Sequence, residues 1–470
     1  MKMQFKEIPG SIVAPKGFLA SGVFCDIKRL GTGKGSQKGE KRDLALIVSV
    51  VPATVAGMFT TNQICAAPVK VCIERVKKGV AQAIVANSGN ANACTGKQGL
   101  KDAKEMAAAV AAVYDRRRSK AKATPAVTEQ RYKISAEHVL VGSTGRIGVT
   151  LPMANVRAGI NEAVTLLDNS LESAAHAAEA IMTSDTRPKE IAVEFKLGGK
   201  TVCLGGICKG AGMIQPGMNA TGTRPAASSL HATMLCFLTT DAAIKTRVLQ
   251  SALHEAVAQS FNRITVDGDM STNDTVLVLA NGLAGNRKLG VRNSELGIFQ
   301  AALKHVCLEL AKMIARDGEG VHRVVTVRVN GAKSAADADA AARAVANSAL
   351  VKTSWHGGDP NWGRIIDALG YSSAKVVEEK VDIGYSASTS ASDAWAQQTG
   401  SRKILWSLKR GQPTKATFKQ LCAAVAPKEF DLHINLNVGQ GSAVIYAADL
   451  TEAYVDFNKG DVNDPSSLGG

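Results

Sequence analysis

The sequence predicts a large layered protein in which helices and strands are mixed, of the α/β or α+β class. Short apolar runs rich in β-branched residues alternate with stretches whose apolar residues recur at helical spacing. Neighbouring strand candidates are often separated by hairpin-like spacing, and no segment repeats along the chain, which argues against a solenoid. The 470 residues correspond to about three domains of ~150 residues, or to one large enzyme core with additions.

The first part of the chain holds strand candidates that run into polar turns. Apolar runs predict buried strands at residues 44–51, 82–86 and 138–141. The second run leads into NSGNANACTG and the third into GSTGRIG, and both segments read as turns because Gly and Asn accept left-handed backbone. Helices are predicted at 100–113 and, as a pair, within 152–182.

The second part continues the alternation. A hairpin is predicted over residues 191–207, turning at Gly198-Gly199. A helix follows near 248–261, because its apolar residues share one face: Val248, Leu249, Leu253, Val257 and Phe261. Further strands are expected around 264–266, 275–282 and 324–329, and further helices at 296–314 and 334–348. The remainder is expected to be mainly strands and loops.

The charge is strongly basic, with 56 Lys and Arg against 41 Asp and Glu and a net charge of +15. Part of the excess is local, in two stretches at 28–43 and 116–122 that read as exposed loops. Aromatic residues make up only 4%, too few for a base-stacking platform, and GTGKGS lacks the GxxxxGK[ST] spacing of a phosphate loop. A nucleic-acid-binding protein is therefore the less favoured class, and salt-dependent retention of DNA or RNA would be its signature.

The sequence shows no sign of a membrane helix, a signal peptide or a metal site. It contains no run of about 18 apolar residues, which a membrane helix needs, and its first residues lack the apolar stretch of a signal peptide, so a cytoplasmic protein is expected. The nine Cys are scattered and odd in number; the closest pair, Cys203 and Cys208, fits no zinc or redox spacing. The eight His form no metal-ligand motif, so no metal is expected.

Small polar clusters follow several strand candidates and predict a site lined by loops and hydroxyl groups. They are NSGNAN (87–92), GSTG (142–145), TSDT (183–186), KGAGM (209–213), TTD (239–241) and GDMSTNDT (268–275). Without a metal or a His dyad, a nucleophile needs another base, and the α-amino group of a Thr freed by chain cleavage can serve. The candidate lies in SSLHATMLCFLTTDA, where an Ala-Thr pair precedes an apolar strand.

With these motifs, the sequence resembles the ornithine acetyltransferase family of arginine biosynthesis, whose members are also called bifunctional glutamate N-acetyltransferases. The matching stretches run in family order over nearly the whole chain. They are GMFTTNQICAAPV (57–69), ANSGNANACTG (86–96), GSTGRIG (142–148), KGAGMIQPGM (209–218), ATMLCFLTTDA (232–242), DGDMSTNDTVLVLANG (267–282), DGEG (317–320), ALVKTSW (349–355) and DPNWGRI (359–365).

The resemblance implies an αββα sandwich of the kind found in self-cleaving aminopeptidases. The expected division is a catalytic sandwich at 1–290, a smaller α+β domain at 291–430 and a C-terminal segment at 431–470 that returns to the active site. Cleavage between Ala232 and Thr233 would give two chains that stay associated, in an expected heterotetramer of two of each.

The resemblance also implies the chemistry. The Thr233 hydroxyl would accept the acetyl group of N-acetylornithine and pass it to glutamate, with the Thr233 amine as general base in both halves of a ping-pong reaction. The Thr144 hydroxyl and the Gly145 N–H would form the oxyanion hole; read without the family, GSTG is more often an ordinary turn. No cofactor is implied, and the use of acetyl-CoA as a second donor is left open.

Substrate-binding residues carry over by position. Thr183 and Lys209 match family positions, and Lys209 would meet the α-carboxylate that ornithine and glutamate share. Glu319 would pair with the side-chain ammonium of ornithine. Asn458 matches the Asn of the closing segment, and Asn463 stands where the family has Thr. Without the family, Lys209 and Glu319 each read as a solvated residue on a turn.

Three departures from the family are visible. The basic stretches at 28–43 and 114–133 look like surface insertions. The third, at 219–231, lies just before the nucleophile and contains a second Ala-Thr pair, Ala220-Thr221. Thr221 is nearer the family spacing from the KGAGM motif, but only Thr233 is followed by the intact strand motif, and its offset to Glu319, 319 − 233 = 86, fits an ungapped run.

Two enzyme hypotheses thus stand beside the nucleic-acid-binding one. The first is acetyl transfer from N-acetylornithine to glutamate. The second is an aminopeptidase or amidase on the same sandwich, in which water replaces glutamate as acceptor. Release of free acetate without glutamate would distinguish the second.

Overall fold

The computed structural model describes residues 5–28, 41–120, 133–223, 234–291, 294–388 and 404–459. The chain divides into two compact units. The first comprises residues 1–262, 269–314 and 460–470, and the second comprises 263–268 and 315–459. We describe each unit by itself.

The first unit is built on a sheet of nine described strands that runs β1-β6-β7-β8-β10-β3-β4-β5, with β2 also paired to β3. Its strands are β1 (Lys6–Glu7), β2 (Phe18–Val23), β3 (Leu44–Phe59), β4 (Val80–Asn90), β5 (Val139–Arg146), β6 (Lys189–Leu197), β7 (Lys200–Lys209), β8 (Leu235–Thr240) and β10 (Thr275–Ala280). Three short 3-10 turns accompany them at Ser11–Val13, Ala136–His138 and Phe261–Arg263.

The long strand β3 lets this sheet fold over into two packed layers. Its first part pairs with β2 and β4, and its last residues pair with β10, with an irregular register against β4 between Val48 and Ala53. A Cβ added at Gly142 on β5 would lie 3.0 Å from the Phe237 ring on β8, although three strands separate β5 from β8 in the hydrogen-bonding order. The two strands therefore face each other across the core.

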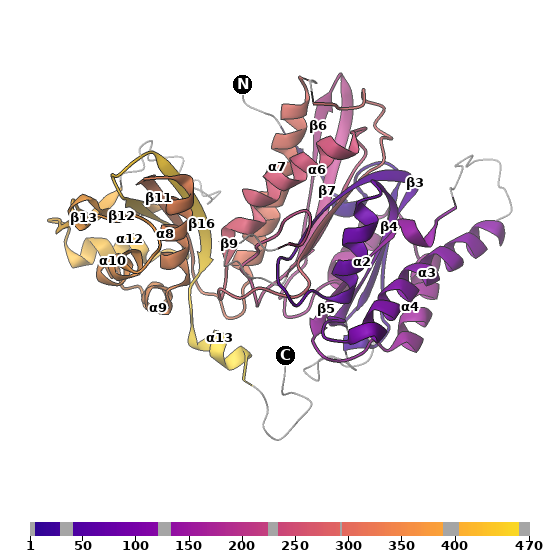
Figure 1. Cartoon of the computed structure of the whole chain (residues 1–470), viewed down its shortest axis with the longest axis horizontal. Coiled ribbons are helices and arrows are strands. Elements are labelled where there is room, and N and C mark those ends of the chain that lie inside the picture. Colours follow the sequence, from indigo (N-terminus) through magenta and orange to yellow (C-terminus); the bar gives the residue numbers. More distant parts are fainter. Residues whose placement is uncertain are drawn as a thin grey trace. The chain divides into compact units, whose positions relative to one another are not determined.

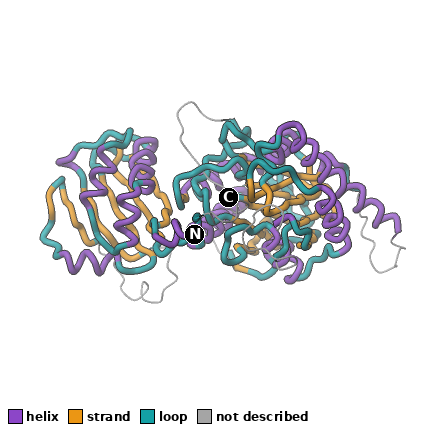
Figure 2. Tube along the Cα trace, turned by 90° about the horizontal axis from the view of Figure 1, so that it is seen from below, coloured by secondary structure: helices purple, strands orange, loops and turns teal. Residues whose placement is uncertain are grey.

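Helices flank both layers, which confirms the expected sandwich (Figures 1 and 2). The helices α2, α3 and α4 pack against strands of the β3-β4-β5 layer, whereas α6 packs against the last residues of β3 and α7 against β7. These helices and α5 span Ala67–Val76 (α2), Gly96–Lys120 (α3), Met153–Thr165 (α4), Leu171–Ala180 (α5), Thr246–Ala258 (α6) and Leu296–Arg316 (α7). None of the described helices is both long and apolar enough to cross a bilayer.

The second unit has its own seven-stranded sheet, in the order β14-β13-β12-β15-β11-β16-β9. Its strands are β9 (Ile264–Thr265), β11 (Val324–Ala332), β12 (Asp382–Ala387), β13 (Leu405–Lys409), β14 (Gln412–Pro413), β15 (Glu429–Asn435) and β16 (Gly441–Ala448). Alternate residues of β11 and the Ala-rich face of α8 are fully buried and form its apolar core. The helices are α8 (Ala335–Asn347), α9 (Ala349–His356), α10 (Trp362–Gly370), α12 (Phe418–Val425) and α13 (Glu452–Phe457), with a 3-10 turn at Glu378–Lys380.

The predicted helices and strands are confirmed, but several of their boundaries are wrong, as is the prediction of mainly strands and loops for the last part of the chain. The strands β4 and β5 continue into the segments predicted as turns, because the parallel ladder between them extends through Ser88–Thr144 and Gly89–Gly145. The helix predicted at 100–113 is α3, which runs to Lys120 and so includes part of the stretch predicted as a basic loop. The last part of the chain holds helices where mainly strands and loops were expected.

The domain borders differ from the expected ones at two places. The helix α7, expected beyond the first border at residue 290, belongs to the first unit as far as Ile314, where it packs against β7. Residues 431–459, expected to form a separate C-terminal segment, lie in the second unit, because β15 and β16 are inner strands of its sheet.

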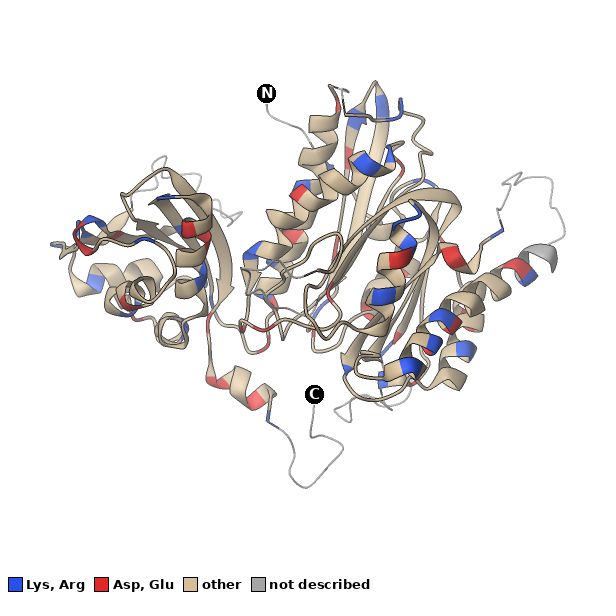
Figure 3. Cartoon of the chain, in the orientation of Figure 1, with Lys and Arg blue, Asp and Glu red and all other residues tan. Residues whose placement is uncertain are grey.

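Basic and acidic residues are mixed along the described helices of the first unit. Figure 3 shows Lys and Arg interspersed with Asp and Glu along α2 and α3. Arg157 pairs with Glu105, and Lys78 pairs with Glu137 at 2.7 Å. Lys28, predicted to lie in an exposed loop, is 5% exposed, and its Nζ donates to the Arg42 carbonyl at 2.6 Å. Most of the remaining basic stretch, 29–40, lies outside the described residues.

Candidate active site

The end of β5 presents Thr144 and Gly145 to the interior of the first unit. Thr144 is 1% exposed. Gly145 has a φ of +125°, and a Cβ there would lie 2.4 Å from the carbonyl carbon of Gly89 on the neighbouring strand. Only glycine accepts both this backbone conformation and this approach. The end of β5 is therefore fixed by backbone packing, with the Thr144 hydroxyl in the buried interior.

Lys209 reaches this hydroxyl from the opposite layer. It is the last residue of β7 and is 2% exposed, so the interpretation as a solvated turn residue is wrong. Its Nζ donates to Thr144 Oγ1 at 3.3 Å. Because the Thr144 oxygen accepts this bond, its hydroxyl hydrogen is left to point at another acceptor.

Asp185 is the anion of this site. It lies in the loop after α5, where its Oδ2 accepts from the Thr183 N–H at 2.9 Å and its Oδ1 accepts from the Gly210 N–H at 2.7 Å. Lys189 Nζ donates to the same Oδ1 at 2.6 Å. Burial alone would raise the pKa of Asp185, but the ammonium groups of Lys209 and Lys189 and the Gly210 amide lower it to about 2. Asp185 is therefore ionised at neutral pH and neutralises two buried lysines.

A second buried carboxyl group holds the chain next to the predicted nucleophile. Asp274 Oδ1 accepts from the Met234 N–H at 2.6 Å, and Asp274 Oδ2 has no hydrogen-bond partner among the described residues. Burial raises the pKa of Asp274 well above its usual range. The adjacent Asn273 donates through Nδ2 to the Ser143 carbonyl at 2.7 Å, which ties this loop to the residue before Thr144. The chain at Met234 is thus fixed beside the Thr144–Lys209 pair.

The predicted cleavage pair, Ala232 and Thr233, lies outside the described residues, as does Asn463. The rival Thr221 is described. It is exposed, and its N–H and hydroxyl both donate to Asn219 Oδ1, at 3.0 and 3.2 Å. This is a local side-chain turn with its hydroxyl occupied.

Glu319 and Asn458 meet in the second unit. Asn458 Nδ2, just after α13, donates to Glu319 Oε2 at 3.1 Å. A Cβ added at Gly320, with φ +64°, would lie 2.3 Å from the Tyr454 nitrogen, so the DGEG turn needs glycine to lie against α13. The fold of the second unit thus brings together Glu319 and Asn458, two of the predicted substrate-binding residues that are far apart in the sequence.

Sequence reasoning did not single out Asp185, Asn273 or Asp274. All three lie in polar clusters that it named, TSDT and GDMSTNDT. The available signal was an Asp followed four residues later by a Lys, as in Asp185 and Lys189, but this spacing is common on surfaces. Only the burial of both side chains distinguishes the pair.

Comparison with known proteins identifies the family of this chain. The family model described as the ArgJ family matches residues 28–460. The arginine biosynthesis bifunctional protein ArgJ of Symbiobacterium thermophilum is 43% identical over 96% of this chain and 98% of that protein. The glutamate N-acetyltransferase of Methanocaldococcus jannaschii is 42% identical over 96% and 98%.

A solved structure is also similar. It is the crystal structure of the arginine biosynthesis bifunctional protein ArgJ from Bacillus halodurans, 36% identical, with a TM-score of 0.39, over 47% of this chain and 100% of that chain. Since the family model covers most of the chain and relatives above 40% identity cover nearly all of it, the chain belongs to the ArgJ family.

Proposed function

We propose that this chain is a glutamate N-acetyltransferase of arginine biosynthesis, which moves the acetyl group of N-acetylornithine to glutamate. Family membership and the names of the relatives above 40% identity support the assignment. The observation that carries it is in the first unit: Met234, the residue after Thr233, is anchored by Asp274 beside the buried pair of Thr144 and Lys209.

Hydrolysis of the Ala232–Thr233 peptide bond, which happens once and precedes turnover, frees the α-amino group of Thr233. In the first half-reaction this amine takes the proton of the Thr233 hydroxyl. Thr233 Oγ then bonds to the acetyl carbonyl carbon, and the carbonyl oxygen becomes an oxyanion. The Thr144 hydroxyl donates to that oxygen, together with the Gly145 N–H. The C–N bond breaks as the Thr233 ammonium returns the proton to the leaving amine, giving ornithine and an acetyl ester on Thr233.

In the second half-reaction, the glutamate amine attacks the ester and the same groups act in reverse order. Lys209 supports the oxyanion hole because its donation to Thr144 Oγ1 turns the hydroxyl hydrogen away from β7. We assign Glu319 and Asn458, which are hydrogen-bonded to each other, to the substrate side chain and Thr183 to the substrate frame.

Cleavage would leave the two fragments associated. The strand β7 precedes the cleavage point and β8 follows it, yet the two pair along Leu204–Thr240 to Lys209–Leu235. On the other side, β10 from the second fragment pairs with β3 from the first. Separation would break two ladders in the middle of a buried sheet. A heterotetramer of two of each fragment is our proposal for the assembly, and native mass spectrometry tests it.

The direct experiment incubates purified protein with N-acetylornithine, with and without glutamate, and quantifies ornithine, N-acetylglutamate and acetate. Transfer predicts that N-acetylglutamate forms in step with ornithine and that acetate stays low. Acetate released at the same rate without glutamate would instead identify an amidase. A third reaction, with acetyl-CoA and glutamate, determines whether the chain also uses that donor.

A further inference from the structure

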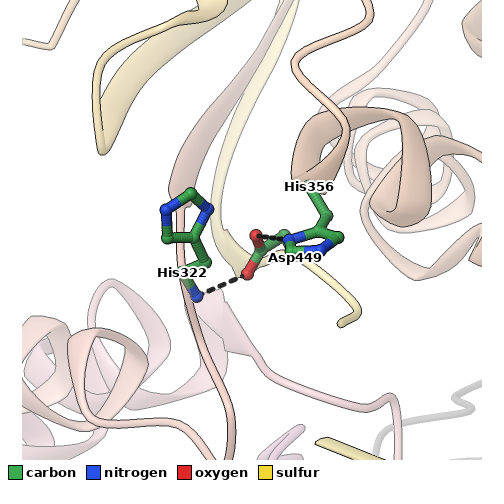
Figure 4. Close-up of side chains that lie close together, drawn as sticks. All are labelled: His322, His356 and Asp449. Carbon is green, nitrogen blue, oxygen red and sulfur yellow. Dashed lines mark hydrogen bonds and ion pairs between the residues drawn. The ribbon is translucent and has the colours of Figure 1, made fainter. Parts of the chain in front are cut away.

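A cluster of three potential metal ligands lies in the second unit, apart from the residues assigned to acetyl transfer. His322 precedes β11, His356 ends α9 and Asp449 follows β16 directly. Figure 4 shows the Asp449 carboxylate with one oxygen toward the backbone nitrogen of His322 and the other toward the His356 ring. One potential ligand atom from each residue lies within 4.8 Å of the other two.

The spacing of two of these atoms leaves room for a bound ion. His356 Nδ1 and Asp449 Oδ2 are 3.6 Å apart, within the range of an ion pair but too far for a hydrogen bond, and neither atom has a hydrogen-bond partner among the described residues. Ligand atoms that lie about 2.0–2.1 Å from a tetrahedral zinc ion are ~3.4 Å from each other. The observed gap is therefore close to the edge of a zinc coordination tetrahedron.

The surroundings prepare these atoms as ligands. The Asp449 side chain is fully buried, and its Oδ1 accepts from the His322 N–H at 3.0 Å, so the orientation of the unpartnered Oδ2 is fixed. His356 Nε2 lies 2.8 Å from Glu452 Oε2. A carboxylate on the outer ring nitrogen is the usual second contact of a zinc-bound histidine, since it leaves the inner nitrogen as an unprotonated ligand.

Two cations oppose a metal ion at this place. Arg323 Nη1 donates to the lone pair of His322 Nδ1 at 3.2 Å and to the Trp355 carbonyl at 3.0 Å, so a zinc ion bound to that nitrogen must displace the guanidinium from it. Lys352 Nζ donates to the Ala448 carbonyl, next to Asp449. The carboxylates of Asp449 and Glu452 offset these charges. Nitrogen ligands with a single inner carboxylate favour zinc over calcium or magnesium, which prefer oxygen.

We propose that His322, His356 and Asp449 form a zinc site, with Glu452 as the outer partner of His356 and a fourth position open to solvent beside the exposed His322. The ion would join the start of β11, the end of α9 and the end of β16. Glu452 is the first residue of α13, so the site also reaches the helix that precedes Asn458. No local spacing in the sequence announces this set, because its members come from three distant segments.

The test is zinc binding by the full-length chain at neutral pH, measured by competition with a chromophoric chelator. Cys94 is an exposed thiol among the described residues, so all variants carry Cys94→Ser. We expect one zinc per chain and an absorption spectrum of four-coordinate cobalt when Co²⁺ replaces zinc. His356→Ala should abolish both, and Glu452→Gln should weaken binding by about 10–100-fold.

His254→Ala is the matched control, because His254 is an exposed histidine on α6 in the first unit. It should bind zinc as the parent does. Zinc should also raise the thermal midpoint of the parent and of His254→Ala but not that of His356→Ala. If His356→Ala does not fold, His322→Ala, at an exposed side chain, takes its place. Absence of stoichiometric binding, or binding unchanged in the His322 and His356 variants, would overturn the proposal.

Discussion

Replacing Asp185 by asparagine should destabilise the first unit by about 3–5 kcal/mol, because the change leaves two buried ammonium groups without their anion. Lys189 and Lys209 are 1% and 2% exposed. Burying a charge without a partner is strongly unfavourable, whereas the same lysines next to a carboxylate are neutralised. The wild-type arrangement is thus much more sensitive to loss of the anion than a surface ion pair would be.

The hydrogen bonds add to the effect. Both oxygens of Asp185 accept: Oδ1 from Gly210 and Lys189, and Oδ2 from the Thr183 N–H. Asparagine has one acceptor oxygen and one NH₂ group. Whichever way the asparagine side chain is oriented, its NH₂ group replaces an oxygen that accepted from at least one of these donors. At least one hydrogen bond is therefore lost, and the NH₂ group is placed against another N–H group.

Thermal and urea unfolding measure the loss, with Asp241→Asn as the matched control. Asp241 is also buried and also accepts two backbone N–H groups, from Cys203 at 2.8 Å and Lys16 at 3.2 Å. Burial raises the pKa of Asp241, whereas the pKa of Asp185 is lowered, so replacing Asp241 by an uncharged residue should cost less stability. We expect Asp185→Asn to lower the midpoint of thermal unfolding by at least ~6 °C.

The pH dependence gives a second measure of the same interaction. The pKa of Asp185 falls from 3.8 to about 2 on folding, so its ionised form stabilises the fold above pH 3.8, and that stabilisation is lost as the pH falls toward 2. At 1.36 kcal/mol per unit, the loss is about 2 kcal/mol. The difference in the free energy of unfolding between the parent and Asp185→Asn should therefore become smaller as the pH falls from 3.8 toward 2. Equal destabilisation by the two Asn variants, or a difference independent of pH, would refute the reasoning.

Three further predictions concern the reaction and its preparation. Thr144→Ala removes an oxyanion donor, so kcat should fall by about 10²–10³ with little change in KM, and activity within twofold of the parent would give Thr144 a structural role only. Glu319→Gln should slow N-acetylornithine turnover by roughly tenfold while the KM for glutamate stays level or improves, because like-charge repulsion is removed; equal losses for both substrates would contradict this role. Asp274→Ala should block the appearance of a fragment that begins at Thr233, whereas Asp274→Asn, which still accepts from Met234, should retain it. Cleavage of both variants at the parental rate, followed on gels, would count against Asp274 as a positioning residue.

The strands of the core were predictable because their apolar runs are long enough to be distinctive. The runs at 44–51 and 82–86 lie within β3 and β4. Their ends were not predictable, because a parallel partner can extend a ladder through polar residues, as Ser88 and Thr144 show. Hydroxyl and glycine residues there look like a turn in sequence and are strand residues in the fold.

The short helices of the second unit were not predicted from the sequence, although signals for their start were present. Side chains of Ser348, Asn361 and Thr417 cap α9, α10 and α12, so the start signals were present. These helices have only eight or nine residues, too few for an apolar periodicity to stand out from a loop. Their stability comes from packing in the unit's core, which no local pattern reports.

The candidate site was predictable as a set of loops but not as a set of contacts. The GSTG and KGAGM motifs identified Thr144 and Lys209, but the contact between them depends on the folding-over of the sheet at β3. Asp185 and Asp274 have opposite pKa shifts although both are buried carboxyl groups. Two nearby lysines make the difference at Asp185, and such neighbours are known only once the chain is folded.

The most direct test of the account is the intact mass of the protein after incubation with N-acetylornithine alone, followed by addition of glutamate. The account predicts two fragments, the second beginning at Thr233. It further predicts that this second fragment gains the mass of one acetyl group on its N-terminal residue and loses it when glutamate is added. An uncut chain with full activity, a second fragment that begins at Thr221, or turnover in which Thr233 never carries the acetyl group would contradict it.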